Sequence, residues 1–331
     1  MKKNIKKFLT LVLTLALVTV CFAGCGAKEQ TGDKTYKIGV IQFMSHPSLD
    51  NCYNGIEQAL KDSGLSYTID RQIGSSASAE ADCTNFAQNM VASDYDMIFA
   101  IATPAAGAAF AATDETDIPV IFCAVSDPVG AGIVDSIETP KYNCTGTSDI
   151  LDLEAQVELI QNMQPDVKKI GILYTSSEEN SLSNLAKFRT VCDAKNIEVV
   201  ASAVQSSTDI PAAAEDLAGK VDCINNFTDN NVVNNLSVVL NAAERHGIPV
   251  YGSEVEQVKN GCLAAVSIEY VALGKVTGEM GIEVLKGADA ANMAVRTITD
   301  ATPVINSEVL SALNITMPEK YKNAETVTTN K

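Results

Sequence analysis

Short clusters of small polar residues follow apolar runs at six places in this 331-residue chain. In chain order they are Ser45-His46-Pro47, Thr103-Pro104, Ser126-Asp127-Pro128, Thr175-Ser176-Ser177, Thr228-Asp229-Asn230 and Ser253-Glu254. Hydroxyl, amide and carboxylate groups of this kind can hydrogen-bond a small polar molecule. The same residue types are preferred N-caps of helices, so local structure alone could explain any single cluster. Six clusters, shared evenly between the two halves of the chain, favour a binding site.

The apolar runs before these clusters alternate with amphipathic stretches throughout the chain beyond Tyr36. The predicted strands are Lys37–Phe43, Tyr67–Ile73, Met97–Ala102, Val120–Val125, Ile170–Tyr174, Val199–Val204, Val221–Phe227, Val250–Gly252 and Leu263–Val266. The predicted helices are Asp50–Ser63, Ser78–Ser93, Pro104–Thr113, Asp152–Met163, Ser181–Lys195, Asp209–Ala218, Asn230–His246, Tyr270–Lys286 and Ser307–Leu313. Asp50 is the expected cap of the first helix, and Gly64 and Gly247 are expected helix ends. This alternation predicts an α/β fold with parallel sheets that helices cover on both faces.

Ligands of open parallel sheets bind at the carboxyl ends of the strands, where all six clusters should lie. The series of strands and helices divides near 143–149, and a second series begins at Ile170, so the chain should form two lobes. The edges of the two sheets at the carboxyl ends of their strands should face each other and form a cleft. Helix N-terminal amide groups near Pro104, with the hydroxyls of Thr103 and Ser126, could hold a carboxylate. Asp229 from the other half could hold an ammonium group. Such a ligand is fully paired only when the cleft is closed.

Composition and motifs exclude several other functions. The net charge of −17 opposes binding to nucleic acid, and two histidines are too few for a histidine-rich metal site. The nine cysteines include no C-x-x-C pair and mostly lie in apolar runs, so we expect buried thiols. Glycine-rich cofactor motifs and a G-x-S-x-G motif are absent, so we expect no cofactor. A hydrolase that uses His46, and glycoside chemistry by paired carboxylates, stay open.

The first 24 residues have the pattern of an export signal. A basic segment, Met1 to Lys7, precedes an apolar stretch, Phe8 to Val20, which is the right length for a signal peptide. Small residues then precede Cys25, a candidate for lipidation, and residues 25–35 form a polar tether. An ordinary secretory signal with a fortuitous cysteine is the alternative. Both interpretations predict an exported protein.

Several stretches resemble one family of proteins over nearly the whole chain after the tether. They are Gly39–Asp50, Ile101–Ala106, Ala124–Ala131, Thr145–Asp149, Gly171–Ser181, Thr228–Asn230 and Val255–Gly261. These stretches look like those of substrate-binding lipoproteins of ABC transporters. They are most similar to the subgroup with the type I periplasmic-binding-protein fold that is linked to uptake of tryptophan and other aromatic amino acids.

The resemblance implies two doubly wound parallel-sheet lobes joined by a three-segment hinge. The implied lobes are residues 36–145 with 268–299 and residues 146–267 with 300–322, followed by a frayed tail at 323–331. The chain would cross between them near Asn143–Thr147, Val266–Glu269 and Ile298–Ala301. The ligand-binding positions that the resemblance implies are Ser45, His46, Pro47, Thr103, Pro104, Ser126, Asp149, Ser176, Ser177, Asn180 and Asp229. Phe43 and Tyr174 are candidates for the apolar wall, although both could equally be core residues.

The expected function is that of an extracytoplasmic receptor, anchored to a bacterial membrane by lipid at Cys25. It would bind tryptophan, phenylalanine or tyrosine and deliver it to a membrane permease, whose partner is a separate ATPase. We expect a monomer with no metal, cofactor or nucleic acid. A sugar, a purine nucleoside or a branched amino acid is the alternative ligand. A surface-anchored α/β hydrolase and a structural or adhesive lipoprotein are the alternative classes.

Overall fold

The computed structural model describes residues 34–298 and 301–330. The predicted signal peptide, Cys25 and most of the tether lie outside the described residues. Within the described residues, no helix is long and apolar enough to cross a membrane. The folded unit begins at Tyr36, and the description below concerns this unit.

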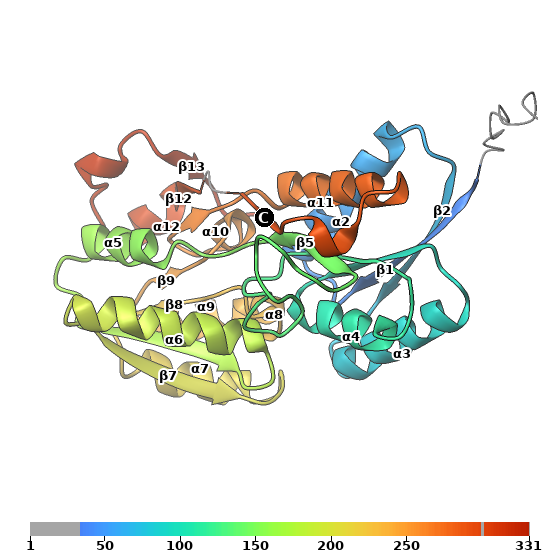
Figure 1. Ribbon diagram of the computed structural model, residues 1–331. Helices are drawn as coiled ribbons and strands as arrows, with labels where there is room; N and C mark the ends of the chain where they lie inside the picture. The colour runs from blue at the N-terminus through green and yellow to red at the C-terminus, as the bar shows by residue number, and fades with distance from the viewer. Residues whose placement is uncertain (1–33, 299–300, 331) are drawn as a thin grey trace, which may run out of the picture. The chain divides into compact units, whose positions relative to one another are not determined.

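The first lobe contains a six-stranded parallel sheet in the order β11-β5-β4-β3-β1-β2. Figure 1 labels β1, β2 and β5 of this sheet. Its strands are β1 (Tyr36–Gln42), β2 (Tyr67–Ile73), β3 (Met97–Ile101), β4 (Val120–Cys123), β5 (Cys144–Ser148) and β11 (Arg296–Thr297). Its helices are α2 (Pro47–Asp62), α3 (Ala79–Ala92), α4 (Thr103–Thr113) and α11 (Tyr270–Leu285), with a short 3-10 turn η1 (Ala290–Asn292). Strands β3 and β4 are buried over their whole length, as expected for a sheet covered on both faces.

The second lobe contains a four-stranded parallel sheet and a three-stranded mixed sheet. The first has the order β7-β6-β8-β9, from β6 (Lys169–Thr175), β7 (Glu198–Val204), β8 (Cys223–Asn225) and β9 (Val250–Tyr251). The second has the order β10-β12-β13, from β10 (Ala264–Ser267), β12 (Thr302–Asn306) and β13 (Glu325–Val327). The helical elements are α5 (Leu153–Met163), α6 (Glu179–Ala194), α7 (Ile210–Ala218), α8 (Asn230–Asn234), α9 (Leu236–His246), α10 (Val255–Lys259), α12 (Ser307–Ala312) and η2 (Glu319–Tyr321).

All the predicted strands are present, and the described residues contain four further strands that were not predicted. The additional strands are β5, β11, β12 and β13. They lack the continuous apolar run that identified the others: β5 reads Cys-Thr-Gly-Thr-Ser, and β11 has two residues. The prediction of a frayed tail is wrong, because β13 pairs with β12. The backbone N–H of Asn330 also donates to the carbonyl of Lys259, at 2.7 Å.

Most helix boundaries differ from the prediction by a residue or two, and two helices differ in a way that matters for the site. Helix α2 begins at Pro47, so Asp50 lies inside its first turn and is not its cap. The Asp50 carboxylate instead accepts hydrogen bonds from Gln42 and Arg71. The predicted helix Asn230–His246 is two helices, α8 and α9, which meet at Asn235. Gly247 ends α9 at φ 67°, a left-handed conformation that favours glycine and that confirms this predicted helix end.

The chain crosses between the lobes three times. The first crossing is at 149–152, after β5, and is therefore a few residues later than predicted. The second lies between β10 and α11, and the third between β11 and β12; residues 299–300 of the third lie outside the described residues. After the second crossing, Ile268, Tyr270 and Leu273 join the hydrophobic core of the first lobe. The expected α/β class with two lobes is thus present.

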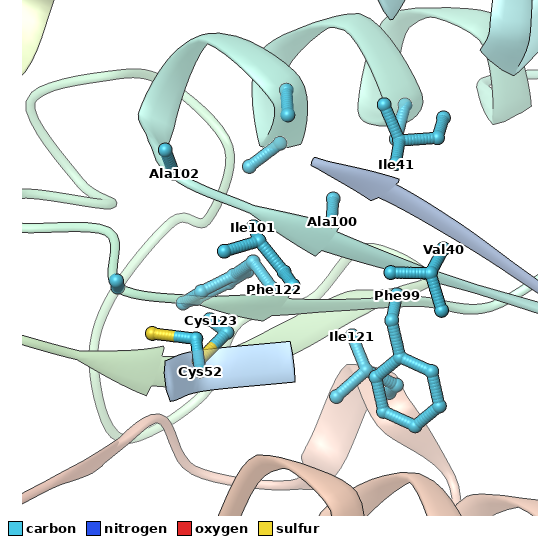
Figure 2. Close-up of a cluster of buried hydrophobic side chains, with 14 of the residues drawn as sticks. Val40, Ile41, Cys52, Phe99, Ala100, Ile101, Ala102, Ile121, Phe122 and Cys123 are labelled. Carbon is cyan, nitrogen blue, oxygen red and sulfur yellow. The ribbon is translucent and has the colours of Figure 1, made fainter. Parts of the chain in front are cut away.

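The core of the first lobe lies on both sides of its sheet. Figure 2 shows Val40 and Ile41 of β1 with Phe99 and Ile101 of β3 in this cluster. The described cysteines are free and buried, as predicted: Cys52, Cys83, Cys123, Cys144, Cys192, Cys223 and Cys262. Burial raises the pKa of the Cys83 and Cys192 thiols to about 12, and it also raises the pKa of Cys52, Cys144, Cys223 and Cys262, which behave as small hydrophobic groups.

Helices α2 and α11 lie side by side on this lobe and touch through glycines (Figure 1). A Cβ atom on Gly274 would lie 2.0 Å from the Cys52 carbonyl oxygen, and one on Gly55 would lie 2.1 Å from the Val271 carbonyl oxygen. Gly274→Val should therefore force the helices apart and lower the free energy of unfolding by about 3 kcal/mol. Urea denaturation measures this loss, with Gly107→Val on α4 as control, since a Cβ there would meet no atom within 4 Å. Equal losses for the two variants would contradict the interpretation.

Candidate functional site

A small cavity of about 20 Å³ lies between the lobes, at the carboxyl ends of the strands. In this closed arrangement the cavity has room for about one water molecule, less than a small organic ligand occupies. The first lobe and the first crossing line it with His46, Ser48, Leu49, Ala102, Thr103, Ala124, Ser126, Asp149 and Tyr270. The second lobe lines it with Asn180, Thr228, Asn230, Val233, Glu254 and Gln257.

Two alanines in the first lobe hold strained backbone conformations at the cavity wall. Ala102, just before α4, has φ 82° and ψ 154°, a region that is almost restricted to glycine. Ala124, just after β4, has φ 57°. Strain of this kind persists at sites where the surrounding structure fixes the backbone for binding. It places the first turn of α4, with the Thr103 hydroxyl, at the cavity, where amide groups that precede the helical hydrogen-bond ladder can bind an anion.

Three buried polar atoms of cavity residues have no hydrogen-bond partner among the described residues. They are Nδ1 of His46, Oγ1 of Thr103 and Oδ1 of Asn180. A buried polar atom without a partner costs about 1–3 kcal/mol, so such atoms in a native structure need an explanation. A polar ligand in the cavity would supply partners for all three.

Asp149 is a buried carboxylate that two hydroxyl groups hold in place. Its Oδ1 accepts a hydrogen bond from Ser126, at 2.9 Å, and its Oδ2 accepts one from Tyr270, at 2.7 Å. Burial raises the pKa of Asp149, although both hydrogen bonds oppose this shift. Each carboxylate oxygen can accept a further hydrogen bond, so Asp149 can receive a cationic group of a ligand.

Glu254 is a second buried carboxylate at the cavity, on the opposite lobe. It caps α10 and accepts hydrogen bonds from the backbone N–H groups of Glu256 and Gln257, both at 2.7 Å. Burial raises the pKa of Glu254 to about 7, although these backbone bonds and the hydroxyl of Ser48 oppose the shift. The group can therefore carry a proton near neutral pH.

The described residues that line the cavity include no lysine and no arginine. His46 adds no positive charge at neutral pH, because burial lowers its pKa to about 4. The fixed groups thus offer carboxylates, neutral donors and a helix N-terminus. This set suits a ligand that carries its own positive charge together with an anionic group.

Hydrogen bonds across the cavity join the two lobes. His46 Nε2 lies 3.3 Å from Oδ1 of Asn230, and the hydroxyls of Ser126 and Thr228 lie 3.4 Å apart. Asn230 is in turn fixed by Glu178, which accepts from its backbone and its side chain at 3.0 and 2.7 Å. The structure therefore holds the lobes closed over the cavity.

Asp229, the expected ammonium partner, does not line this cavity. Its carboxylate is fully buried in the second lobe and accepts four hydrogen bonds. The donors are the backbone N–H of Thr175 at 2.6 Å, the hydroxyls of Thr175 and Ser181 at 2.8 and 2.7 Å, and the N–H of Val232 at 2.9 Å. These bonds cap α8 and join it to β6 and α6, which is a structural role.

The other predicted site residues are divided between the cavity and its surroundings. The cavity brings together His46, Thr103, Ser126, Asp149 and Asn180. A separate open groove between the lobes includes Phe43 and Ser177, and a neighbouring one includes Pro104 and Ser177. Ser45, Pro47 and Ser176 are exposed, and Tyr174 packs against the core of the second lobe. Neither Phe43 nor Tyr174 therefore forms the wall of the cavity.

Sequence reasoning did not select several cavity residues as ligand-binding positions: Ser48, Leu49, Thr228, Asn230, Val233, Glu254, Gln257 and Tyr270. The polar clusters contained Thr228, Asn230 and Glu254, so a signal existed for these three. Leu49 and Val233 lie on helices that look like ordinary amphipathic ones, and Tyr270 reaches the cavity through the second crossing. Only the assembled fold identifies these residues.

Comparison with known proteins gives a family match over residues 37–328, to ABC transporter substrate binding protein. The chain is 35% identical over 325 residues to the tyrosine-binding protein of Clostridioides difficile, covering 95% of this chain and 93% of that protein. Solute-binding proteins at 12–18% identity also match in structure, which shows the shared type I periplasmic-binding fold alone.

Two solved structures with similar sequence identity differ in how well they superpose. An ABC domain in complex with L-Trp from Streptococcus pneumonia is 35% identical with a TM-score of 0.84, covering 89% of this chain and all of that one. A substrate-binding protein with adhesive properties from Clostridium difficile, in its ligand-free, open form, is 34% identical with a TM-score of 0.67 at the same coverage. The closed lobes described above agree with the better match to the complex. This chain therefore belongs to the family of ABC transporter substrate-binding proteins, which are extracytoplasmic solute receptors rather than enzymes.

Proposed function

We propose that this protein binds an aromatic L-amino acid in the interlobe cavity. The observation that carries the proposal is the pairing of a buried carboxylate, Asp149, with the N-terminus of α4 in one cavity that contains no lysine or arginine among its described lining residues. An amino acid has the matching ammonium and carboxylate groups. The relatives named for tyrosine and L-Trp support this ligand class.

In this proposal, each end of the ligand has its own partners. The α-carboxylate accepts hydrogen bonds from the first turn of α4 and from the Thr103 hydroxyl, which has no partner among the described residues. The α-ammonium group donates to Asp149, which replaces Asp229 in this role. Ser126 acts through Asp149, because its hydroxyl already donates to that carboxylate.

The side chain of the ligand would lie among groups from both lobes. Leu49, Val233 and Tyr270 offer apolar and aromatic surface, and Asn180 offers an unpaired amide oxygen. A ring with a polar edge fits such a wall, because the apolar surface accepts the ring and the amide oxygen accepts its N–H or O–H. Tyrosine and tryptophan have such an edge, and phenylalanine does not.

The closed protein would deliver the amino acid to a membrane permease, as the family assignment implies. Lipid attachment at Cys25 would keep the receptor at the outer surface of the cell membrane. Both steps rest on the sequence pattern and the family, and the protein would act as a monomer. Labelling with radioactive palmitate, compared between the natural chain and Cys25→Ala, tests the anchor.

A thermal-shift panel of the natural amino acids, nucleosides and simple sugars tests the ligand class. A ligand at a hundred times its Kd stabilises the fold by about 2.7 kcal/mol, which gives a clear rise in Tm. We expect the largest rise with L-tyrosine or L-tryptophan and none with their D-enantiomers. The chain contains no tryptophan, so the fluorescence of bound L-tryptophan gives an independent signal. A rise only with a sugar, a nucleoside or a branched amino acid would contradict the proposal.

A further inference from the structure

A cluster of three residues joins the lobes outside the cavity. Asp127 lies in the loop after β4 of the first lobe, and Ser183 and Lys187 lie on α6 of the second. The Asp127 Oδ2 atom accepts a hydrogen bond from the Ser183 hydroxyl, at 2.5 Å. The same oxygen receives the Lys187 ammonium group at 2.7 Å. None of the three lines the cavity.

We propose that Asp127, Ser183 and Lys187 form an interlobe latch that sets ligand affinity by stabilising the closed arrangement without touching the ligand. A ligand that is held by both lobes dissociates only when they separate. Its Kd therefore depends on the free-energy difference between the closed and open arrangements as well as on its own contacts. The three residues are positioning residues for binding.

Asp127, the acidic residue of the latch, is held in position by a hydrogen bond within its own lobe. The other carboxylate oxygen of Asp127, Oδ1, accepts from the backbone N–H of Gly130 at 2.9 Å. A Cβ atom on Gly130 would lie 2.8 Å from the Asp127 carboxyl carbon, so the absent side chain leaves room for the carboxylate. Opening of the lobes would thus leave Asp127 with one fixed oxygen, while Oδ2 would lose both of its partners to water.

Ser183 and Lys187, the two residues of the latch on the second lobe, are positioned by helix α6. Ser183 and Lys187 are four residues apart on α6, so their side chains share one face of the helix. Partial burial of Asp127 would raise its pKa, but the bonds from Lys187, Ser183 and Gly130 outweigh this and lower it. The carboxylate is therefore ionised at neutral pH, and the latch is an ion pair reinforced by a hydroxyl.

The size of the effect follows from the exposure of the pair. The side chains of Asp127 and Lys187 are 23% and 46% exposed, so solvent screens their attraction. Exposed pairs of this kind are worth a factor of about two to five in an equilibrium constant. We therefore expect Lys187→Met to raise the Kd about two- to fivefold. Asp127→Asn should raise the Kd somewhat more, because the Ser183 hydroxyl then also loses its charged acceptor.

The test measures the Kd and the dissociation rate of L-tryptophan and L-tyrosine for the two single variants and the double variant. Arg189→Met is the matched control, because Arg189 is an exposed cation on the same helix without an ion pair to the other lobe among the described residues. We expect the ligand to dissociate faster from the variants, and the effects of the two substitutions on Kd to be non-additive in the double variant. The Kd of the natural protein should depend on salt concentration, and that of the variants should not. Lys187→Arg should retain most of the affinity. Additive effects, or equal effects of Lys187→Met and Arg189→Met, would overturn the proposal.

A second measurement needs no ligand. Spin labels at Asp114→Cys on the first lobe and Asn241→Cys on the second would report the interlobe distance, since both positions are exposed and the described native cysteines are buried. We expect Asp127→Asn to shift the distance distribution of the ligand-free protein toward longer distances. An unchanged distribution would overturn the latch. If the natural protein binds neither amino acid, the proposed function fails, and this measurement still decides the latch.

Discussion

Asp149→Asn should weaken binding of the amino-acid ligand by roughly 100-fold, which corresponds to about 3 kcal/mol, while the protein stays folded. The substitution keeps the shape of the side chain but removes the charge that would pair with the ammonium group. In the natural protein the hydroxyls of Ser126 and Tyr270 each donate to one oxygen of Asp149. In the variant, the amide NH₂ group would face one of these two hydroxyls in place of an oxygen acceptor. Isothermal titration calorimetry with L-tyrosine and L-tryptophan measures the loss.

Asp152→Asn is the control for this experiment. Asp152 lies three residues further along and caps α5 by accepting from the N–H of Ala155, away from the cavity. We expect its affinity to match that of the natural protein. Unchanged affinity of Asp149→Asn would show that Asp149 does not hold the ammonium group, and Glu254 would then be the remaining buried carboxylate of the cavity.

The same assignment predicts how binding depends on pH. Because burial raises the pKa of Asp149, its carboxylate takes up a proton at a higher pH than an exposed aspartate does. Pairing with an ammonium group requires the ionised form, so affinity should fall as the pH falls toward that raised pKa. In Asp149→Asn this part of the pH dependence should disappear.

Asp229→Ala should lower the free energy of unfolding by about 3–5 kcal/mol. The substitution removes the acceptor of four hydrogen bonds and leaves Thr175, Ser181 and the N–H of Val232 without their partner in a buried region. It also removes the cap of α8, which is worth about 1 kcal/mol. Urea denaturation followed by circular dichroism measures the change.

Asp209→Ala is the matched control, because Asp209 precedes a helix of the same lobe but is exposed. We expect a loss of less than about 1 kcal/mol for this control. If Asp229→Ala instead kept its stability and lost ligand affinity, Asp229 would hold the ammonium group, as the sequence pattern first indicated.

The sequence predicted the strands that are buried on both faces and the helices that cover them. Runs such as Val120–Val125 are continuous and apolar, so one pattern defined both their position and their type. Strands β5 and β12 carry threonine, serine and asparagine, so neither has a continuous apolar run. Strand β5 ends at the first crossing, and β12 pairs antiparallel with β10. Pairing with neighbours creates these strands, and a local pattern cannot contain that information.

For the site, the sequence pattern predicted the edge of the sheets where the ligand binds and assigned the ammonium group to Asp229, whereas only the resemblance included Asp149. Both acids follow strands, but Asp229 caps α8, whereas the cap of α5 is Asp152 and not Asp149. The difference lies in their neighbours: four donors of the second lobe saturate Asp229, whereas two hydroxyls leave Asp149 able to accept more. Those neighbours come from segments up to 121 residues away, as with Tyr270 and Asp149, so only the folded chain brings them together.

The triple crossing also governs the order in which this protein can fold. Helix α11 and strand β11 complete a lobe that begins at Tyr36, and strands β12 and β13 complete the other. Neither hydrophobic core is whole until the last part of the polypeptide has been synthesised, and contacts between such distant segments form slowly. A nascent chain of this design therefore cannot complete either lobe until it is almost fully synthesised.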